Sequence, residues 1–305
     1  MSTTVAVTLG DPRGIGPEVI PSALRALSPE VSPASLLVIG PEGMDPGVAP
    51  YRSVGPWDGT EAGAGQVTVD AIRLGVELAL EGSVGAIVTG PSHKPAIQAA
   101  GWDVPGQTEL LQKLTGVPDV GMLMCAERTQ VNGSLRVLLA TTHLPLRDLF
   151  LYLTPELLLR QTRLLCSELE ERWQILRPRV GLCAVNPHAS DGGLFGTEEE
   201  ELLSPVVRQL RSEGLEVEGP LPADTVFFRA LRGELDAVVA PYHDVGMAAF
   251  KSVAFGTGVN VTLGLPFVRT SPDHGTAFDI AGKGLADSSS SREAIRLALR
   301  LIRKP

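Results

Sequence analysis

The sequence has 305 residues and a formal net charge of −9, and no segment concentrates lysine or arginine. Because nucleic acids and anionic membranes are bound through concentrated basic surfaces, this charge argues against both as partners. The three cysteines form no CxxC pair, residues 1–7 lack the pattern of a signal peptide, and no apolar stretch approaches the ~20 residues of a membrane span. We therefore expect a cytoplasmic protein with reduced, buried thiols.

Short apolar runs alternate along the chain with longer amphipathic stretches. The runs predict strands at residues 5–9, 36–39, 86–88, 122–125, 137–140, 180–185, 237–239 and 259–263. The amphipathic stretches predict helices at 67–81, 154–173, 198–212 and 292–302. Strands that alternate with helices pair in parallel through crossovers, so the pattern predicts an α/β fold.

The length of the chain exceeds that of one ordinary domain, so it favours either two α/β lobes or one large one. Residues 41–65 are rich in glycine and proline and predict an irregular excursion, and nothing else resembles a flexible tether. We therefore expect a discontinuous arrangement. Residues 1–115 together with 262–305 form the first lobe, and residues 116–261 form the second.

Three of the five histidines share one local context. His143, His188 and His243 each follow the end of a predicted buried strand by a few residues. Ligands of open α/β sheets bind beyond the carboxyl ends of the strands, where three imidazoles could converge on one divalent cation. Singly, each histidine is more often a loop residue, but the repeated placement favours a metal site with positions open for substrate.

Carboxylates accompany these histidines. Asp148 follows His143, Asp191 follows His188, and Asp244 is adjacent to His243. Each could orient a histidine ring or act as a general base.

The glycine-rich segment at residues 10–18, GDPRGIGPE, follows the first strand and opens a helix near Pro17. It is not a dinucleotide fingerprint, because Val19 stands where the third glycine would be, and the chain has no GxxxxGK[ST] motif. A tight turn into a helix explains most of the segment, although Asp11 and Glu18 could contact the site.

Lys251, Asn260 and Arg269 lie between apolar segments downstream of His243. Arginine binds phosphate or carboxylate with a bidentate fork, and lysine binds it as a point charge. Each residue alone is typical of a surface position, but together they predict an anion pocket.

Long segments of the chain, which contain all five histidines, resemble the PdxA family of 4-hydroxythreonine-4-phosphate dehydrogenases over essentially the whole length. The matching segments are TLGDPRGIGPEV, TGPSHKPAI, ATTHLPLRD, NPHASDGGLFGTEE, GPLPADTVF, YHDVGMAAFK and GVNVTLGLPFVRTSPDHGTAFDIAG. The resemblance implies a two-lobed fold like that of isocitrate and isopropylmalate dehydrogenases, with a central cleft and without a GxGxxG Rossmann domain. It also implies a homodimer with its active sites at the interface.

The resemblance implies a role for each site residue. His143, His188 and His243 would bind one divalent ion, either zinc, magnesium or cobalt. The substrate would be held by Gln107, Thr108, Lys251, Asn260 and Arg269, although family members carry histidine where this chain has Gln107. The segment 274–284 is similar to the adenosine-binding loop of isopropylmalate dehydrogenases, in which NAD would be bound by His274, Gly275, Thr276, Ala277 and Asp279.

The implied reaction is NAD-dependent oxidation of 4-phosphohydroxy-L-threonine to a β-keto acid. This acid loses CO₂ to give 3-amino-2-oxopropyl phosphate, in the synthesis of pyridoxal phosphate (vitamin B6). We expect Asp244 to take the hydroxyl proton. One alternative is a dehydrogenase of threonate or erythronate 4-phosphate. The other is a metal-dependent hydrolase without a cofactor, which would have no use for the 274–284 loop.

Overall fold

The computed structural model describes residues 3–302 and divides the chain into two compact units. The first unit combines the segment before Gly121 with the segment after Gly258, and the second unit is Gly121–Gly258. Every run predicted as a strand forms one, and three further strands lie outside those runs. Among the described residues, no helix is long and apolar enough to cross a membrane.

Within the described residues, the first unit has six strands in the order β3-β2-β1-β4-β11-β10. Neighbouring strands are parallel except for the pair β10 and β11, which is antiparallel. Its strands are β1 (Val5–Thr8), β2 (Leu36–Gly40), β3 (Tyr51–Ser53), β4 (Ala86–Thr89), β10 (Val259–Leu263) and β11 (Val268–Pro272). Its helices are α1 (Gly16–Leu27), α2 (Glu61–Leu80), α3 (Lys94–Ala99), α4 (Gln107–Thr115) and α10 (Ser289–Ile302). The excursion predicted at residues 41–65 therefore contains a short strand and the beginning of a helix.

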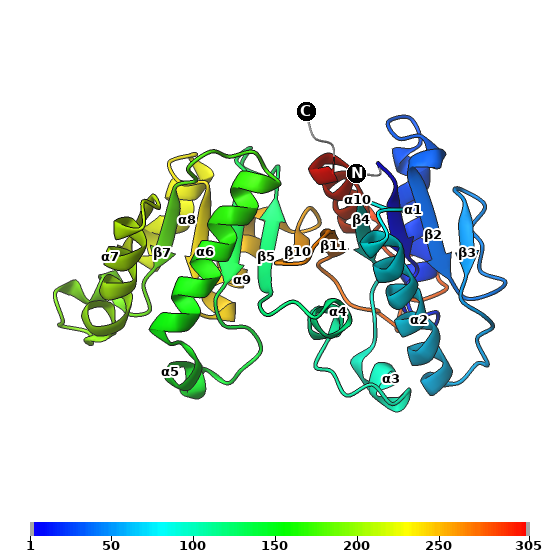
Figure 1. Ribbon diagram of the computed structural model, residues 1–305, viewed down its shortest axis with the longest axis horizontal. Helices are drawn as coiled ribbons and strands as arrows, with labels where there is room; N and C mark the ends of the chain where they lie inside the picture. Colours follow the sequence, from blue (N-terminus) through cyan, green and yellow to red (C-terminus); the bar gives the residue numbers. More distant parts are fainter. Residues whose placement is uncertain (1–2, 303–305) are drawn as a thin grey trace. The chain divides into compact units, whose positions relative to one another are not determined.

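Helices cover both faces of this sheet (Figure 1). On one face, Ile72 of α2 shares a hydrophobic cluster with Ile87 of β4. On the other face, Thr270 of β11 donates a hydrogen bond to the carbonyl of Ala294 in α10. Successive side chains of a strand point to opposite faces, so Arg269 points to the α2 face, beside its register partner Ile87.

The second unit has five strands in the order β5-β6-β9-β7-β8, of which only the pair β5 and β6 is antiparallel among the described residues. The strands are β5 (Gly121–Ala126), β6 (Leu135–Leu139), β7 (Val180–Cys183), β8 (Val217–Leu221) and β9 (Ala237–Ala240). The helices are α5 (Leu149–Tyr152), α6 (Pro155–Glu171), α7 (Ser204–Ser212), α8 (Ala223–Leu231) and α9 (His243–Ala254). The helix predicted at 198–212 is in fact a π-helical turn, Glu199–Leu203, followed by α7.

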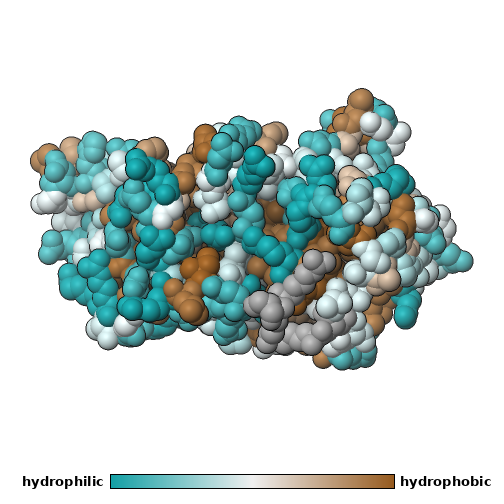
Figure 2. Space-filling model, turned by 90° about the horizontal axis from the view of Figure 1, so that it is seen from above, coloured by the Kyte–Doolittle hydropathy of each residue, from teal (hydrophilic) through white to brown (hydrophobic). Residues whose placement is uncertain are grey.

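The core of the second unit consists of apolar side chains from both faces of its sheet. Phe227 of α8 and Phe250 of α9 share one cluster with Val137 and Leu139 of β6. Helix α6 lies on the opposite face, in front of the strands in Figure 1. Hydrophilic side chains predominate on the face seen in Figure 2, with hydrophobic ones in small groups, because the apolar runs of the sequence form buried strands.

Candidate functional site

The three strand-end histidines follow three neighbouring strands of the second unit. Strands β6, β9 and β7 are adjacent and parallel, so their carboxyl ends share one edge of the sheet. His143 lies four residues beyond Leu139 at the end of β6, and His243 begins α9 after β9. His188 lies in the loop Pro187–Asp191, which follows β7. The strand-end placement predicted from the sequence is confirmed by these elements.

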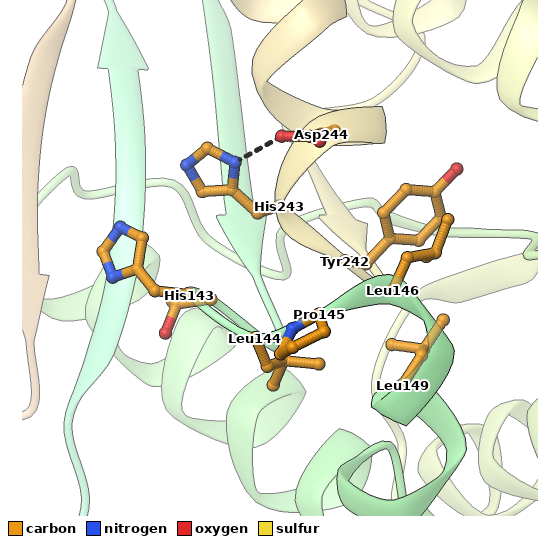
Figure 3. Close-up of a pocket in the computed structure, with 9 residues that line it drawn as sticks. His143, Leu144, Pro145, Leu146, Leu149, Tyr242, His243 and Asp244 are labelled. Carbon is orange, nitrogen blue, oxygen red and sulfur yellow. Dashed lines mark hydrogen bonds and ion pairs between the residues drawn. The ribbon is translucent and has the colours of Figure 1, made fainter.

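His143 and His243 lie side by side. Their ring centroids are 5.4 Å apart with an angle of 45° between the rings. Figure 3 shows both rings on the same side of the pocket, away from Tyr242, Leu146 and Leu149. The pocket has a volume of ≈ 480 Å³, and its lining includes both histidines. The fold therefore places two imidazoles together at an accessible position.

A carboxylate fixes the orientation of one of these rings. Oδ1 of Asp244 lies 2.7 Å from Nδ1 of His243, which donates to it in the tautomer that leaves Nε2 as an acceptor (Figure 3). A carboxylate at Nδ1 also makes the other nitrogen a stronger metal ligand. The Asp244 side chain is 89% exposed, so it has room for a further hydrogen bond.

His188 is held in an unusual backbone conformation. Four consecutive residues, His188 to Asp191, have φ between 45° and 69°, a region that residues other than glycine seldom adopt. The carboxylate of Glu199 holds this loop by accepting hydrogen bonds from the backbone N–H groups of Val185 and Asn186 and from the hydroxyl of Ser190. Burial alone would raise the pKa of Glu199, but these hydrogen bonds outweigh burial and lower the pKa.

The third histidine does not join the other two within one chain. Across residues 3–302, no group of three or more histidine, cysteine, aspartate or glutamate side chains is placed to hold a metal ion. The side chain of His188 is exposed.

Arg269 is a buried cation with neutral partners. It is 3% exposed and donates hydrogen bonds to Thr262 Oγ1 at 2.8 Å, Thr89 Oγ1 at 2.6 Å and Gln107 Oε1 at 2.6 Å. Its Nε atom is buried without a hydrogen-bond partner. Burial lowers the pKa of Arg269 to about 10, against an opposing effect of the Glu109 carboxylate. A buried guanidinium without a hydrogen-bonded carboxylate suits an anionic ligand.

Both polar atoms of the Gln107 side-chain amide form hydrogen bonds within the protein. Its carbonyl oxygen accepts from Arg269, and its Nε2 donates to the carbonyl of Gly90 at 3.0 Å. Gln107 and Thr108 form the start of α4, where backbone N–H groups lack helical partners. Gln107 thus links the buried cation to the loop after β4.

The other two predicted substrate-binding residues lie on different units. Asn260 lies on β10 in the first unit, and its Oδ1 atom is buried without a hydrogen-bond partner. Lys251 lies on α9 in the second unit, with Nζ 5.5 Å from the centre of the Phe255 ring. The orphaned oxygen of Asn260, like the Nε of Arg269, favours a ligand as its missing partner.

The segment 274–284 forms a series of turns after β11. Ile280 N–H donates to the carbonyl of Ala277, and Lys283 Nζ donates to the carbonyl of Asp279 at 2.6 Å. The Asp279 side chain is exposed, and His274 Nε2 is buried without a partner. The loop thus offers an exposed carboxylate and an orphaned ring nitrogen to a ligand.

Sequence reasoning missed several residues around these features. Glu199 accepts hydrogen bonds from the loop that carries His188. It was missed because it lies in a run of four glutamates, a pattern typical of an exposed helix surface. Arg13 and His93 contact the ring of Phe278 in the 274–284 loop, with its centroid 5.1 Å from the Arg13 guanidinium and 4.9 Å from the His93 ring. No local pattern joins three segments so far apart in the chain.

The sequence matches the family model described as "Pyridoxal phosphate biosynthetic protein PdxA" over residues 43–298. A 4-hydroxythreonine-4-phosphate dehydrogenase of Beijerinckia indica is 39% identical, with 97% of this chain and 94% of the relative covered. A D-threonate 4-phosphate dehydrogenase of Cupriavidus necator is 41% identical, with 96% of this chain and 95% of the relative covered.

Solved structures give the same picture of the fold. The crystal structure of a Klebsiella pneumoniae 4-hydroxythreonine-4-phosphate dehydrogenase matches with a TM-score of 0.85 and 37% identity, covering 98% of this chain and 99% of that one. An isocitrate dehydrogenase of Methylococcus capsulatus, 16% identical, matches with a TM-score of 0.53 over 97% of this chain and 84% of that one. The expected isocitrate dehydrogenase-like fold is confirmed.

Proposed function

The chain belongs to the PdxA family, and we propose that this oxidoreductase uses NAD and a divalent metal ion to oxidise 4-phosphohydroxy-L-threonine. The pair of imidazoles at the ends of β6 and β9 is the observation that carries the proposal. The product is a β-keto acid, in which the bond to the carboxylate breaks and CO₂ leaves to give 3-amino-2-oxopropyl phosphate. The hydrolase alternative has no support, because the curated relatives are named as dehydrogenases.

His143 and His243 fit a divalent ion. Zinc binds histidine nitrogen at about 2.0–2.1 Å with near-tetrahedral angles, so two rings on one ion have centroids about 5 Å apart. The separation of 5.4 Å is close to that value. We propose His188 of a second copy as the third ligand, and zinc, magnesium or cobalt as the ion. Bound there, the ion would lower the pKa of the substrate hydroxyl and stabilise negative charge on the oxygen.

A homodimer follows from this ligand set, and exposed apolar side chains of the second unit support it. They occur in the segment after His143 and in the loop after His188, where a partner chain would cover them. They are Leu146, Phe150, Leu151, Tyr152, Leu194 and Phe195. We propose that the active site is completed at the interface between two copies.

Residues of the chain itself hold and deprotonate the substrate in this proposal. Arg269 and Lys251 supply positive charge to the phosphate and carboxylate groups, and Asn260 and Thr108 supply neutral hydrogen-bonding groups. Asp244 orients His243 and takes the hydroxyl proton, because its exposed carboxylate has capacity beyond its bond to Nδ1.

NAD would be bound by the loop 274–284, through His274, Gly275, Thr276, Ala277 and Asp279, and would accept the hydride. The Asp279 carboxylate suits the two ribose hydroxyls of NAD and repels the additional phosphate of NADP. We expect kcat/KM to be higher with NAD than with NADP, and D279A to shift this ratio toward NADP by roughly tenfold.

Steady-state rates with both cofactors check this expectation. The matched control is D45N, which removes an exposed carboxylate that accepts a hydrogen bond from the backbone N–H of Gly47, outside the 274–284 loop. Its cofactor ratio should equal that of the unaltered enzyme. Equal kcat/KM for NAD and NADP in the unaltered enzyme would contradict the assignment of Asp279.

D-threonate 4-phosphate is a second candidate substrate, for two reasons. A relative of that name is 41% identical to the chain, and Gln107 replaces the histidine of the family pattern. NADH formation from each substrate decides between them. We expect kcat/KM to be higher for 4-phosphohydroxy-L-threonine, and the opposite order would assign the chain to threonate oxidation.

The variant Q107H tests what the replacement does. Histidine is ionisable near neutral pH whereas glutamine is always neutral, and Gln107 lies against Arg269. We expect Q107H to lower KM for the phosphorylated substrate mainly at mildly acid pH, where a protonated histidine adds positive charge to the anion site, with kcat little affected. Identical pH profiles of KM for Q107H and the unaltered enzyme would show that this position does not influence the anion site.

A further inference from the structure

The glycine-rich turn at residues 10–18, whose last three residues begin α1, has no role in the proposed site, yet it lies directly against the 274–284 loop. The backbone N–H of Ile15 donates to the carbonyl of Thr276 at 2.9 Å. A Cβ added at Gly14 would lie 2.8 Å from the same carbonyl oxygen and 2.9 Å from the Thr276 Cβ, so no larger residue fits there. The turn therefore fixes the backbone at the beginning of the loop.

Glu18 binds the other end of the same loop. Its carboxylate accepts hydrogen bonds from the backbone N–H groups of Gly282 and Gly284, the second at 3.1 Å. Both glycines have positive φ, 77° and 66°, which turns their N–H groups toward one point. The two N–H groups, on either side of Lys283, thus bind an anionic group, and here the anion is a side chain of the protein.

Arg13 contacts the middle of the loop from the same turn. Its guanidinium lies 5.1 Å from the centre of the Phe278 ring, a cation–π distance. Arg13 is anchored at 2.9 Å to Asp11, whose side chain is fully buried. The turn at 10–18 thus contacts the loop at its beginning, middle and end, and the contact at the end rests on one carboxylate.

We infer that Glu18 is a positioning residue, which holds the 274–284 loop in the conformation that accepts the cofactor. The inference rests on the proposed role of this loop in binding NAD. The loop has exposed residues at Gly275, Phe278, Asp279 and from Gly282 to Leu285, so little burial orders it. Without the carboxylate, NAD would have to order the loop on binding, and this loss of conformational entropy would weaken its affinity.

The variant E18Q tests this role, because glutamine keeps the size of the side chain but has only one oxygen to accept the two N–H groups. We expect KM for NAD to rise roughly tenfold, while kcat at saturating NAD and KM for the phosphorylated substrate stay within about twofold. Amide hydrogen exchange of residues 274–284 without ligand should become faster. A variant that merely weakened the fold would not change KM for one ligand alone.

The matched control is E30Q. Glu30 lies beyond the end of α1 in the same unit, and its carboxylate accepts from Arg296 of α10 at 3.0 Å, away from the loop. E30Q should leave both KM for NAD and exchange of the loop unchanged. Unchanged exchange and KM in E18Q, or equal changes in E18Q and E30Q, would overturn the inference.

Hydrogen exchange of the unaltered protein separates this inference from the proposed function. If NAD slows exchange at residues 274–284, the loop is the cofactor site, and the comparison of E18Q with the unaltered protein decides the role of Glu18. If NAD does not slow exchange there, the cofactor assignment is wrong and the role of Glu18 in cofactor binding falls with it. Faster exchange in unliganded E18Q would then still identify Glu18 as the residue that orders the loop.

Discussion

Replacing His243 with alanine is expected to remove the bound metal and to lower kcat by more than about a hundredfold. Loss of a residue that only orients a metal ligand already costs about 10- to 100-fold in affinity or activity, so loss of the ligand itself should cost more. The fold should persist, because His243 is partly exposed. The same helix remains anchored by Phe250, which packs in the hydrophobic core and is not changed. Metal content and NADH formation, measured on the same preparation, check the prediction.

H188A should also remove the bound metal and lower kcat by more than about a hundredfold. We expect this although His188 is exposed and forms no group of three metal-ligating side chains within residues 3–302. In both variants, stabilisation by NAD should remain, because the 274–284 loop lies in the first unit. Retained metal and normal turnover in H188A would show that this histidine is not a ligand. A loss of NAD-induced stabilisation would instead indicate that the substitution disturbs more than the metal.

R269M is expected to abolish stabilisation by the phosphorylated substrate while leaving stabilisation by NAD intact. A ligand that binds only the folded state contributes about 2.7 kcal/mol at roughly 100-fold excess over its Kd, which is readily seen as a rise in Tm. The buried guanidinium forms hydrogen bonds with three neutral side chains. We therefore expect an anionic substrate to bind to this cation. Retained substrate-induced stabilisation in R269M would place the anion elsewhere.

The pH dependence of stability gives a further check on Arg269. Burial lowers the pKa of this group from its ordinary value to about 10 in the folded protein. The unfolded state therefore binds more protons than the folded state above this pH. The free-energy cost of burying the charged group is fully present below about pH 10, and it declines as the pH rises from there toward the higher pKa of the unfolded state. Near neutrality the group stays charged, so any pH dependence of substrate binding there must come from other residues.

The sequence predicted most strands because a strand buried between parallel neighbours has few polar residues, as in β9 and β7. Strand β11 escaped prediction because its buried positions include Arg269, Thr270 and Ser271. Arg269 and Thr270 find hydrogen-bond partners on other elements, such as Thr89 and the carbonyl of Ala294. Those partners are brought together only by the tertiary fold, so no local sequence pattern predicts these hydrogen bonds.

The candidate site was predictable to the extent that it depends on strand ends. The position of each histidine after a strand can be read from the chain. The adjacency of β6, β9 and β7 cannot, because these strands do not follow one another in chain order. The direction of His188 cannot be read, because it depends on a left-handed backbone run held by Glu199. The role of Glu18 was equally hidden, since its partners lie 264 and 266 residues away.

Hybrid dimers test most directly whether two chains build one metal-dependent dehydrogenase site. H188A and H243A chains carrying different affinity tags are co-expressed, and dimers that hold both tags are isolated. One site of each hybrid then has His143 and His243 from one chain and His188 from the other, and the second site lacks both replaced histidines. We predict one bound metal per hybrid and roughly half the wild-type rate of NADH formation from 4-phosphohydroxy-L-threonine, with both parent variants inactive. Hybrids as inactive and as metal-free as their parents would contradict the account.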